Sequence, residues 1–209
     1  KYLALQESAL IPDAVSSSNA VGFWQFKKET AEDYGLIIND KIDERKNIVS
    51  STRAASKYIK NSNFLFENWI FSIYSYYQGL NGAKAVVDPK LYGSKRMTID
   101  TNTHWYIIKF LGYKIAFENY TNSKNYNDNF SVYENRSFSS VKDLSKNLSI
   151  DRSELTSFNS WIKSDRIPRD KVYSFLIPEK KENVFKRTAS IITDKTDDII
   201  EEKFTSPID

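Results

Sequence analysis

The first 26 residues read KYLALQESALIPDAVSSSNAVGFWQF, and the interpretation of the whole chain starts from them. Tyr2 begins a run of good helix formers that Pro12 ends, because proline restricts the conformation of the residue before it. Residues 13–21 then read as a loop. Glu7 stands within the helix among uncharged, mostly apolar neighbours. We therefore expect at least one helical face beside Glu7 to be buried.

A carboxyl group on a buried face loses the hydration of its charged form, so its pKa rises. Such a group holds a proton near neutral pH and can act as a general acid. Taken alone, a glutamate in a short amphipathic helix is more often a solvated surface residue than a buried acid. The neighbouring sequence favours the first interpretation: Ser16 can donate a hydrogen bond, Gln25 can donate and accept, and Phe23 and Trp24 offer apolar faces of the kind that sugar rings stack against.

The rest of the first 120 residues is predicted to be helical. A short helix starts near Lys28 and ends at Gly35, and Ser51 is the expected N-cap of a longer one. A further helix is expected before Gly79, on the pattern of Trp69, Ile70, Ile73, Tyr74 and Tyr77. The last helix of this part is expected from about Thr103, with Ile108, Leu111 and Ile115 on one face.

The order of these motifs resembles the lytic transglycosylase family of the lysozyme superfold, especially its membrane-bound type D members. The matching residues are Glu7-Ser8, Ser16, Gly22-Phe23-Trp24-Gln25-Phe26, Asp43-Glu44-Arg45, Ser51-Thr52-Arg53-Ala54-Ala55, Tyr58, Trp69 and Ser75-Tyr76-Tyr77-Gln78-Gly79. The resemblance covers about the first 120 residues. It implies a mainly α fold, with a lysozyme-like helical transglycosylase domain over residues 1–122. It also implies further residues ahead of the catalytic helix.

In that family one glutamate is the sole catalytic acid and base, which maps to Glu7. The resemblance assigns substrate contacts to Ser16, Gln25 and Tyr76, and Phe23, Trp24 and Tyr77 complete the expected binding set. The sequence departs from the family pattern at Asn19, where a glycine is usual, and at Tyr77, where an asparagine is usual. Tyr77 either packs differently in an active enzyme or blocks a sugar subsite and leaves a protein that only binds.

The reaction that the resemblance implies is cleavage of the β-1,4 bond between N-acetylmuramic acid and N-acetylglucosamine, with formation of a 1,6-anhydro ring. One carboxyl group suffices for this intramolecular reaction, whereas ordinary glycosidases place two across the bond. The alternative functions are an inactive peptidoglycan-binding or scaffold protein and a water-using muramidase. The muramidase needs a second carboxylate, and Asp43 and Glu44 are interpreted instead as ion-pair partners beside Arg45.

Composition excludes several other classes of site. The chain has no cysteine and one histidine, His104, which is interpreted as a packing or capping residue. Disulfides, a zinc cluster and a Ser-His-Asp triad are thereby disfavoured, and we expect no metal and no cofactor. Thirty Lys and Arg against 27 Asp and Glu are too balanced for a dedicated nucleic-acid binder. No apolar run is long enough to span a membrane. The expected partners are peptidoglycan glycan strands and envelope proteins, and the expected location is the periplasm or cell envelope.

The predicted secondary structure changes from helices alone to strands and helices after the polar stretch at 121–129, where we expect a domain boundary. Strands are expected at 130–133 and 172–177, and short helices at 141–148 and 152–158. This order resembles a small α+β LysM-like module over residues 130–178, although the usual Gly-Asp-Thr-Leu opening is replaced by residues 136–140. Such modules bind N-acetylglucosamine-containing glycans, and a scaffold role is the alternative. Residues 179–209 are expected to form a charged C-terminal extension.

Overall fold

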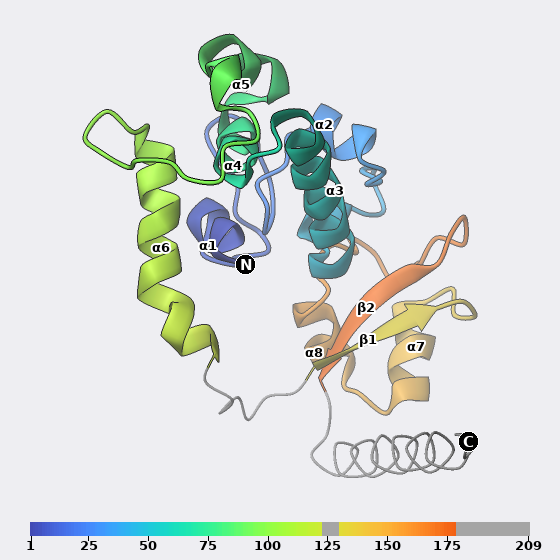
Figure 1. The fold of residues 1–209 in the computed structure, drawn as a ribbon. Coiled ribbons are helices and arrows are strands. Elements are labelled where there is room, and N and C mark those ends of the chain that lie inside the picture. Colours follow the sequence, from blue (N-terminus) through green and yellow to red (C-terminus); the bar gives the residue numbers. More distant parts are fainter. Residues whose placement is uncertain (123–129, 179–209) are drawn as a thin grey trace, which may run out of the picture.

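The computed structural model describes residues 1–122 and 130–178, which form a helical part and a small α+β module (Figure 1). The elements of the helical part are α1 (Tyr2–Ser8), α2 (Lys28–Asp33), the 3₁₀ turn η1 (Glu44–Lys46), α3 (Ile48–Phe66), α4 (Trp69–Gln78), α5 (Leu80–Val86), the 3₁₀ turn η2 (Pro89–Leu91) and α6 (Trp105–Asn122). The predicted fold class, mainly α with a small α+β module, is confirmed.

Two helix boundaries differ from the sequence prediction. Helix α1 ends at Ser8 rather than near Pro12, because Ala9 and Leu10 already have positive φ values of 52° and 62°. The N-cap of α3 is Asn47, whose side chain accepts hydrogen bonds from two backbone N–H groups of the first turn. Ser51 was the wrong candidate. It lies buried inside the helix and donates its hydroxyl to the Asn47 carbonyl.

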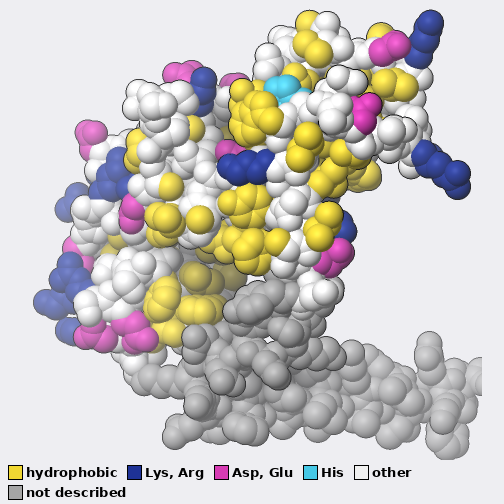
Figure 2. Space-filling view, turned by 90° about the vertical axis from the view of Figure 1, so that its left-hand side faces the viewer, with side chains coloured by type: hydrophobic (Ala, Val, Ile, Leu, Met, Phe, Trp, Pro, Cys, Tyr) yellow, Lys and Arg dark blue, Asp and Glu magenta, His cyan; other side chains and the backbone are white. Residues whose placement is uncertain are grey.

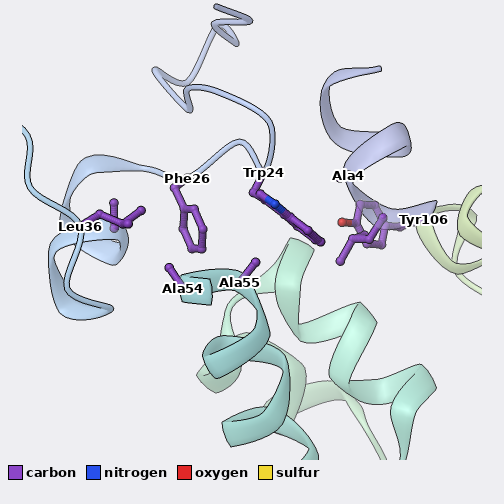
Figure 3. Packing of buried hydrophobic residues seen from close by; sticks show 9 residues of the cluster. Ala4, Trp24, Phe26, Leu36, Ala54, Ala55 and Tyr106 are labelled. Atoms are coloured by element: carbon purple, nitrogen blue, oxygen red, sulfur yellow. The ribbon is translucent and has the colours of Figure 1, made fainter. Parts of the chain in front are cut away.

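The core of the helical part joins α1, α3 and α6 around Trp24. Ala54 and Ala55 of α3 are almost fully buried, and their small side chains let Trp24 and Phe26 pack closely against the helix (Figure 3). Ala4 of α1 and Tyr106 of α6 belong to the same cluster. This packing fixes α1 between α6 and α3 (Figure 1).

The predicted packing face of α6 is wrong. Ile108 and Ile115 are 45% and 76% exposed, while Tyr106 and Ile107 are buried. Apolar and aromatic residues occupy several sides of this helix, so their spacing does not single out the buried one.

The C-terminal module consists of β1 (Phe130–Asn135), α7 (Val141–Leu148), α8 (Arg152–Ser157) and β2 (Tyr173–Pro178). The predicted order of strand, helix, helix and strand is confirmed. The strands pair antiparallel, with Phe130 opposite Pro178 and Asn135 opposite Tyr173. Trp161, Leu144 and Phe175 fill the core beneath them. The expected extension at 179–209 and most of the expected linker, 123–129, lie outside the described residues.

The segment ahead of η1 ties the two parts together. Ile42 is fully buried in the core of the C-terminal module although it precedes α3 in sequence. The Asp43 N–H donates to the Trp161 carbonyl at 2.8 Å, and the Lys163 N–H donates to the Lys41 carbonyl at 2.9 Å. The module therefore shares a core and backbone hydrogen bonds with the helical part.

Candidate active site

Glu7 lies at a cavity of about 690 Å³ between α1, the loop that follows it and the C-terminal end of α4. The described residues that line the cavity are Glu7, Ser16, Ser18, Ala20, Gln25, Phe26, Lys27, Thr30, Tyr58, Tyr76, Tyr77, Gln78 and Gly79. Glu7 is the only carboxylate among them. Five of the seven predicted site residues are therefore brought together: Glu7, Ser16, Gln25, Tyr76 and Tyr77.

The carboxyl group of Glu7 is half-buried and accepts a hydrogen bond from the hydroxyl of Tyr106. Burial raises the pKa of Glu7, while the Tyr106 hydrogen bond and the positive charge of Lys109 oppose this rise without cancelling it. The group is thus better able to hold a proton than an ordinary surface glutamate. This is the protonation state that a general acid requires.

Tyr106 is a site residue that the sequence analysis missed. Burial and the neighbouring Glu7 raise its own pKa, so its hydroxyl stays protonated and acts as a donor to the carboxyl group. Ninety-nine positions separate the two residues, and no motif links them. The sequence signal near Tyr106 is the His104-Trp105-Tyr106 run at a helix start, which identifies no partner.

Ser8 and Gly22 fix the turn at 21–26, the first to α1 and the second against η1. The Ser8 hydroxyl donates to the Phe23 carbonyl at 2.8 Å, which connects the helix to the turn at 21–26. Gly22 has a φ of +85°, and a Cβ atom there would come within 2.1 Å of the Arg45 carbonyl oxygen. The turn therefore requires glycine both for its backbone conformation and for its close approach to η1.

Gln25 and Ser16 both line the cavity, and hydrogen bonds hold each side chain. The Gln25 side-chain amide donates to the carbonyls of Ala14 and Gly22, at 3.1 and 3.0 Å. The Ser16 hydroxyl accepts from the Ala20 N–H at 3.1 Å. These bonds fix two polar side chains at the wall before any ligand binds.

Phe23 and Trp24 do not line the cavity. Trp24 is 7% exposed, and its indole N–H donates to the Thr52 hydroxyl at 2.9 Å. Phe23 is half-buried and packs against the same core cluster. The sequence predicted that these two rings present apolar faces to a sugar. In the structure they pack in the helical core instead.

Tyr76 and Tyr77 lie at the end of α4 but have different surroundings. The Tyr76 hydroxyl donates to the Trp24 carbonyl at 2.8 Å, and its ring packs against Phe26 and Tyr58. Burial raises the pKa of Tyr76 well above its ordinary value. Tyr77 is 47% exposed and stacks on Tyr106, with ring centroids 4.8 Å apart.

Asp43 and Glu44 lie away from the cavity wall, and their interpretation as ion-pair residues is confirmed. Asp43 pairs with Arg45 at 2.7 Å, and Glu44, 1% exposed, pairs with Lys171 of the C-terminal module at 2.7 Å. Burial acts to raise the pKa of Asp43, but the hydrogen bonds and charge of Arg45 outweigh it and lower the pKa.

His104 has the packing and capping role that was predicted. Its Nδ1 accepts the Tyr106 N–H at 3.2 Å at the start of α6, and its ring packs against Tyr74 and Tyr77. Within residues 1–122 and 130–178, no cluster of three or more His, Cys, Asp or Glu side chains is arranged to hold a metal ion. The helices of that part of the chain include none with the length and apolar content needed to cross a membrane.

Comparison with known proteins gives a matching family model and two similar relatives. A family model described as transglycosylase SLT domain matches residues 1–90. The chain is 27% identical over 193 residues to membrane-bound lytic murein transglycosylase D of Escherichia coli strain K12, an alignment that covers 85% of this chain and 42% of the relative. The protein of the same name from Escherichia coli O6:H1 strain CFT073 matches to the same extent. The chain thus spans less than half the length of these relatives. These matches confirm the resemblance: residues 1–90 are similar to the transglycosylase SLT domain, and the chain is similar to membrane-bound lytic murein transglycosylase D.

Proposed function

We propose that this protein is a peptidoglycan lytic transglycosylase in which Glu7 is the single general acid and base. The observation that carries the proposal is the half-buried Glu7 carboxyl group with a raised pKa, at a cavity that no other described carboxylate lines. The SLT domain match and the name of the relatives support the same reaction class.

In the first step, protonated Glu7 gives its proton to the glycosidic oxygen between N-acetylmuramic acid and N-acetylglucosamine, and the bond from that oxygen to the anomeric carbon breaks. General acid catalysis of this kind contributes roughly 10²- to 10⁴-fold to the rate. The acetamido group of the muramic acid residue shares the positive charge that develops at the anomeric carbon. Tyr106, hydrogen-bonded to Glu7, holds the carboxyl group in place.

In the second step, the C6 hydroxyl of the same muramic acid attacks the anomeric carbon. The Glu7 carboxylate takes the proton of that hydroxyl and returns to its initial state. The product carries a 1,6-anhydro ring, and no water is added. Because the nucleophile belongs to the substrate, one carboxyl group is enough for both steps, in contrast to the paired carboxylates of ordinary glycosidases.

Purified sacculi incubated with the protein test the reaction, with products identified by mass. We expect 1,6-anhydromuramic ends from the unchanged protein and none from Glu7→Gln, which removes the transferable proton while preserving the size of the side chain. Reducing ends would contradict the proposal and indicate a muramidase. Anhydro products from Glu7→Gln would refute the role of Glu7.

A binding-only function is the second candidate, and the observation that favours it is the Tyr77 ring at the cavity wall. Sacculi that are bound without cleavage would support it. We further propose that residues 130–178 are a LysM-like module that contacts glycan or serves as a scaffold. The cell envelope follows as the location, because peptidoglycan is found there, and envelope proteins remain proposed partners.

A further inference from the structure

Two half-exposed aromatic rings extend the cavity wall outward from Glu7. Tyr77 at the end of α4 lines the cavity, and Trp105 begins α6 directly beside it. Their ring centroids are 5.2 Å apart at an interplanar angle of 77°, which is an edge-to-face contact. Tyr77 is 47% exposed and Trp105 is 53% exposed. A continuous apolar surface thus leads from the cavity to the start of α6.

Both rings pack against neighbouring aromatic side chains, of which Tyr106 is buried and His104 is half-buried. Tyr77 stacks on Tyr106, which is 3% exposed and donates to Glu7. His104 packs against both Tyr77 and Trp105, at centroid distances of 5.3 and 5.6 Å. In Figure 2, the surface beside the cyan histidine is hydrophobic. Because the rings are already ordered, a ligand that covers them does not have to immobilise them.

The chemistry of this surface selects for a ring-shaped ligand with one apolar face. Tyr and Trp combine a large apolar face with a polar edge, and pairs of such rings at the mouth of a cavity are typical of ligand-binding grooves. A pyranose has an apolar face of C–H groups and a rim of hydroxyls. A polymer of such rings that enters the cavity also has to pass Tyr77, which lines it, and Tyr77 is in contact with Trp105.

We propose that Tyr77 and Trp105 form an aromatic shelf that binds a pyranose ring of the glycan strand immediately outside the Glu7 cavity. This shelf rests on the proposed function, because it requires a glycan strand to bind in the Glu7 cavity. In this proposal Tyr77 binds the sugar ring, at the position where the family pattern has an asparagine. Trp105 becomes a specificity-determining residue for strands long enough to reach it.

Binding is measured on the full chain carrying Glu7→Gln, so that the ligand is not cleaved. The probes are purified peptide-free glycan strands and a short chitooligosaccharide, with Kd determined by calorimetry. In this background Trp105→Ala is expected to raise the Kd for glycan strands about five- to tenfold, and Trp105→Phe to restore most of the affinity. Tyr77→Asn is expected to weaken binding by a similar factor.

The matched control is Trp69→Ala. Trp69 is 57% exposed and also begins a helix, but it lines a separate cavity with Asn63 and Met97, whereas Trp105 contacts Tyr77 of the Glu7 cavity. Its loss is expected to leave the Kd within about twofold of the starting value. Unfolding temperatures of all variants are compared, so that a loss of affinity is not confused with a loss of fold.

The outcomes separate this proposal from the proposed function. An unchanged Kd for Trp105→Ala overturns the shelf, even where the unchanged protein yields anhydro products. A higher affinity for Tyr77→Asn also overturns it, because the phenol would then obstruct the strand. Glycan binding that depends on Trp105 in a protein that cleaves nothing supports the shelf and contradicts the enzymatic proposal. A Glu7→Gln protein that binds no glycan refutes the shelf.

Discussion

The raised pKa of Glu7 has a consequence for stability as well as for catalysis. A folded-state pKa above the ordinary value of 4.5 means that the folded protein binds this proton more tightly than the unfolded chain does. The stabilising contribution is therefore complete below the unfolded-state pKa, and it is lost as the pH rises through the folded-state pKa. Above the folded-state pKa, ionised Glu7 destabilises the fold.

Glu7→Gln should consequently stabilise the protein at pH values above the folded-state pKa of Glu7. The glutamine keeps an oxygen that accepts from Tyr106, but it carries no charge to bury. Each tenfold difference in proton affinity between the folded and unfolded states corresponds to about 1.4 kcal/mol. Thermal unfolding from about pH 4 to about pH 8 measures the effect. The advantage of the variant should grow with pH, and a constant difference would contradict the burial of the charge.

Tyr106→Phe tests the hydrogen bond to Glu7 through the pH dependence of activity. Glu7 must be protonated to act as an acid, so activity falls as the pH rises through its pKa. The hydroxyl of Tyr106 favours the carboxylate form, and its loss should raise the pKa of Glu7 further. The alkaline limb of the kcat/KM profile should therefore move to higher pH.

Tyr113→Phe on the same helix is the control: it also removes one hydroxyl but keeps the ring that Lys109 lies over, so it should leave that limb in place. If Tyr106→Phe lowers activity equally at every pH, the hydroxyl does not act through the protonation of Glu7.

Single residues were predictable from sequence where their local context carries the signal. Glu7 was found from its apolar neighbours, and Gln25 from its place in a motif. Tyr106 was not found, because only the packing of α6 against α1 brings it to Glu7. Trp24 was assigned to the cavity because an aromatic side chain fits a sugar surface and a core equally well. Its burial is decided by Ala54 and Ala55, a contact that spacing does not reveal.

The turn at 21–26 depends on a glycine whose replacement should disrupt the cavity wall. Gly22 and Gly35 have nearly equal positive φ values, +85° and +84°, but only Gly22 faces a close neighbour. Gly35→Ala should therefore cost about 1–2 kcal/mol, which is the backbone strain alone. Gly22→Ala adds a steric clash with the Arg45 carbonyl and should cost more than about 4 kcal/mol.

Urea unfolding of the two variants gives the comparison. Because the turn carries Gln25, Gly22→Ala should also weaken glycan binding, whereas Gly35→Ala should not. Equal destabilisation of the two variants would show that the contact with Arg45 is relaxed without cost.

Helices and strands were predictable where a capping residue coincides with a clear pattern. The prediction for α7 matches the structure over 141–148, because Ser140 caps it and its apolar face is distinct. For α3, Asn47 and Ser51 are both residue types that cap helices, and a tertiary contact decides which of them forms the N-cap. The Asn47 side chain also donates to the Ser174 carbonyl at 2.9 Å, and this bond to the C-terminal module selects Asn47.

At the scale of the whole molecule, the C-terminal module is integral to the fold. Lys171 pairs with buried Glu44, Asn47 donates to the strand β2, and Ile42 fills the core of the module. Arg45, three residues after Ile42, contacts the turn at 21–26 through its carbonyl. This segment therefore connects the core of the module to the wall of the Glu7 cavity. Residue spacing does not indicate this connection, because Ile42 stands alone between Lys41 and Asp43 and fits either core.

Ile42→Ala measures how strongly the two parts depend on each other. Truncation of a fully buried isoleucine should cost about 2–5 kcal/mol, since the cavity left behind adds to the lost burial. Because Ile42 belongs to the chain of one part and the core of the other, both should lose stability together. Hydrogen exchange of α3 and of β2 reports the two parts separately, and we expect protection to fall by the same factor in each.

Ile115→Ala is the matched control, because that side chain is 76% exposed and its loss should change exchange in neither part. Two separate unfolding transitions, with Ile42→Ala moving only the one that exposes β2, would show that the module is an independent attachment. A single transition that Ile42→Ala shifts as a whole would mean that changes in the module reach the cavity wall through Ile42 and Arg45. Under that outcome, the affinity of the Glu7 cavity for glycan should also fall in Ile42→Ala, although this residue does not line the cavity.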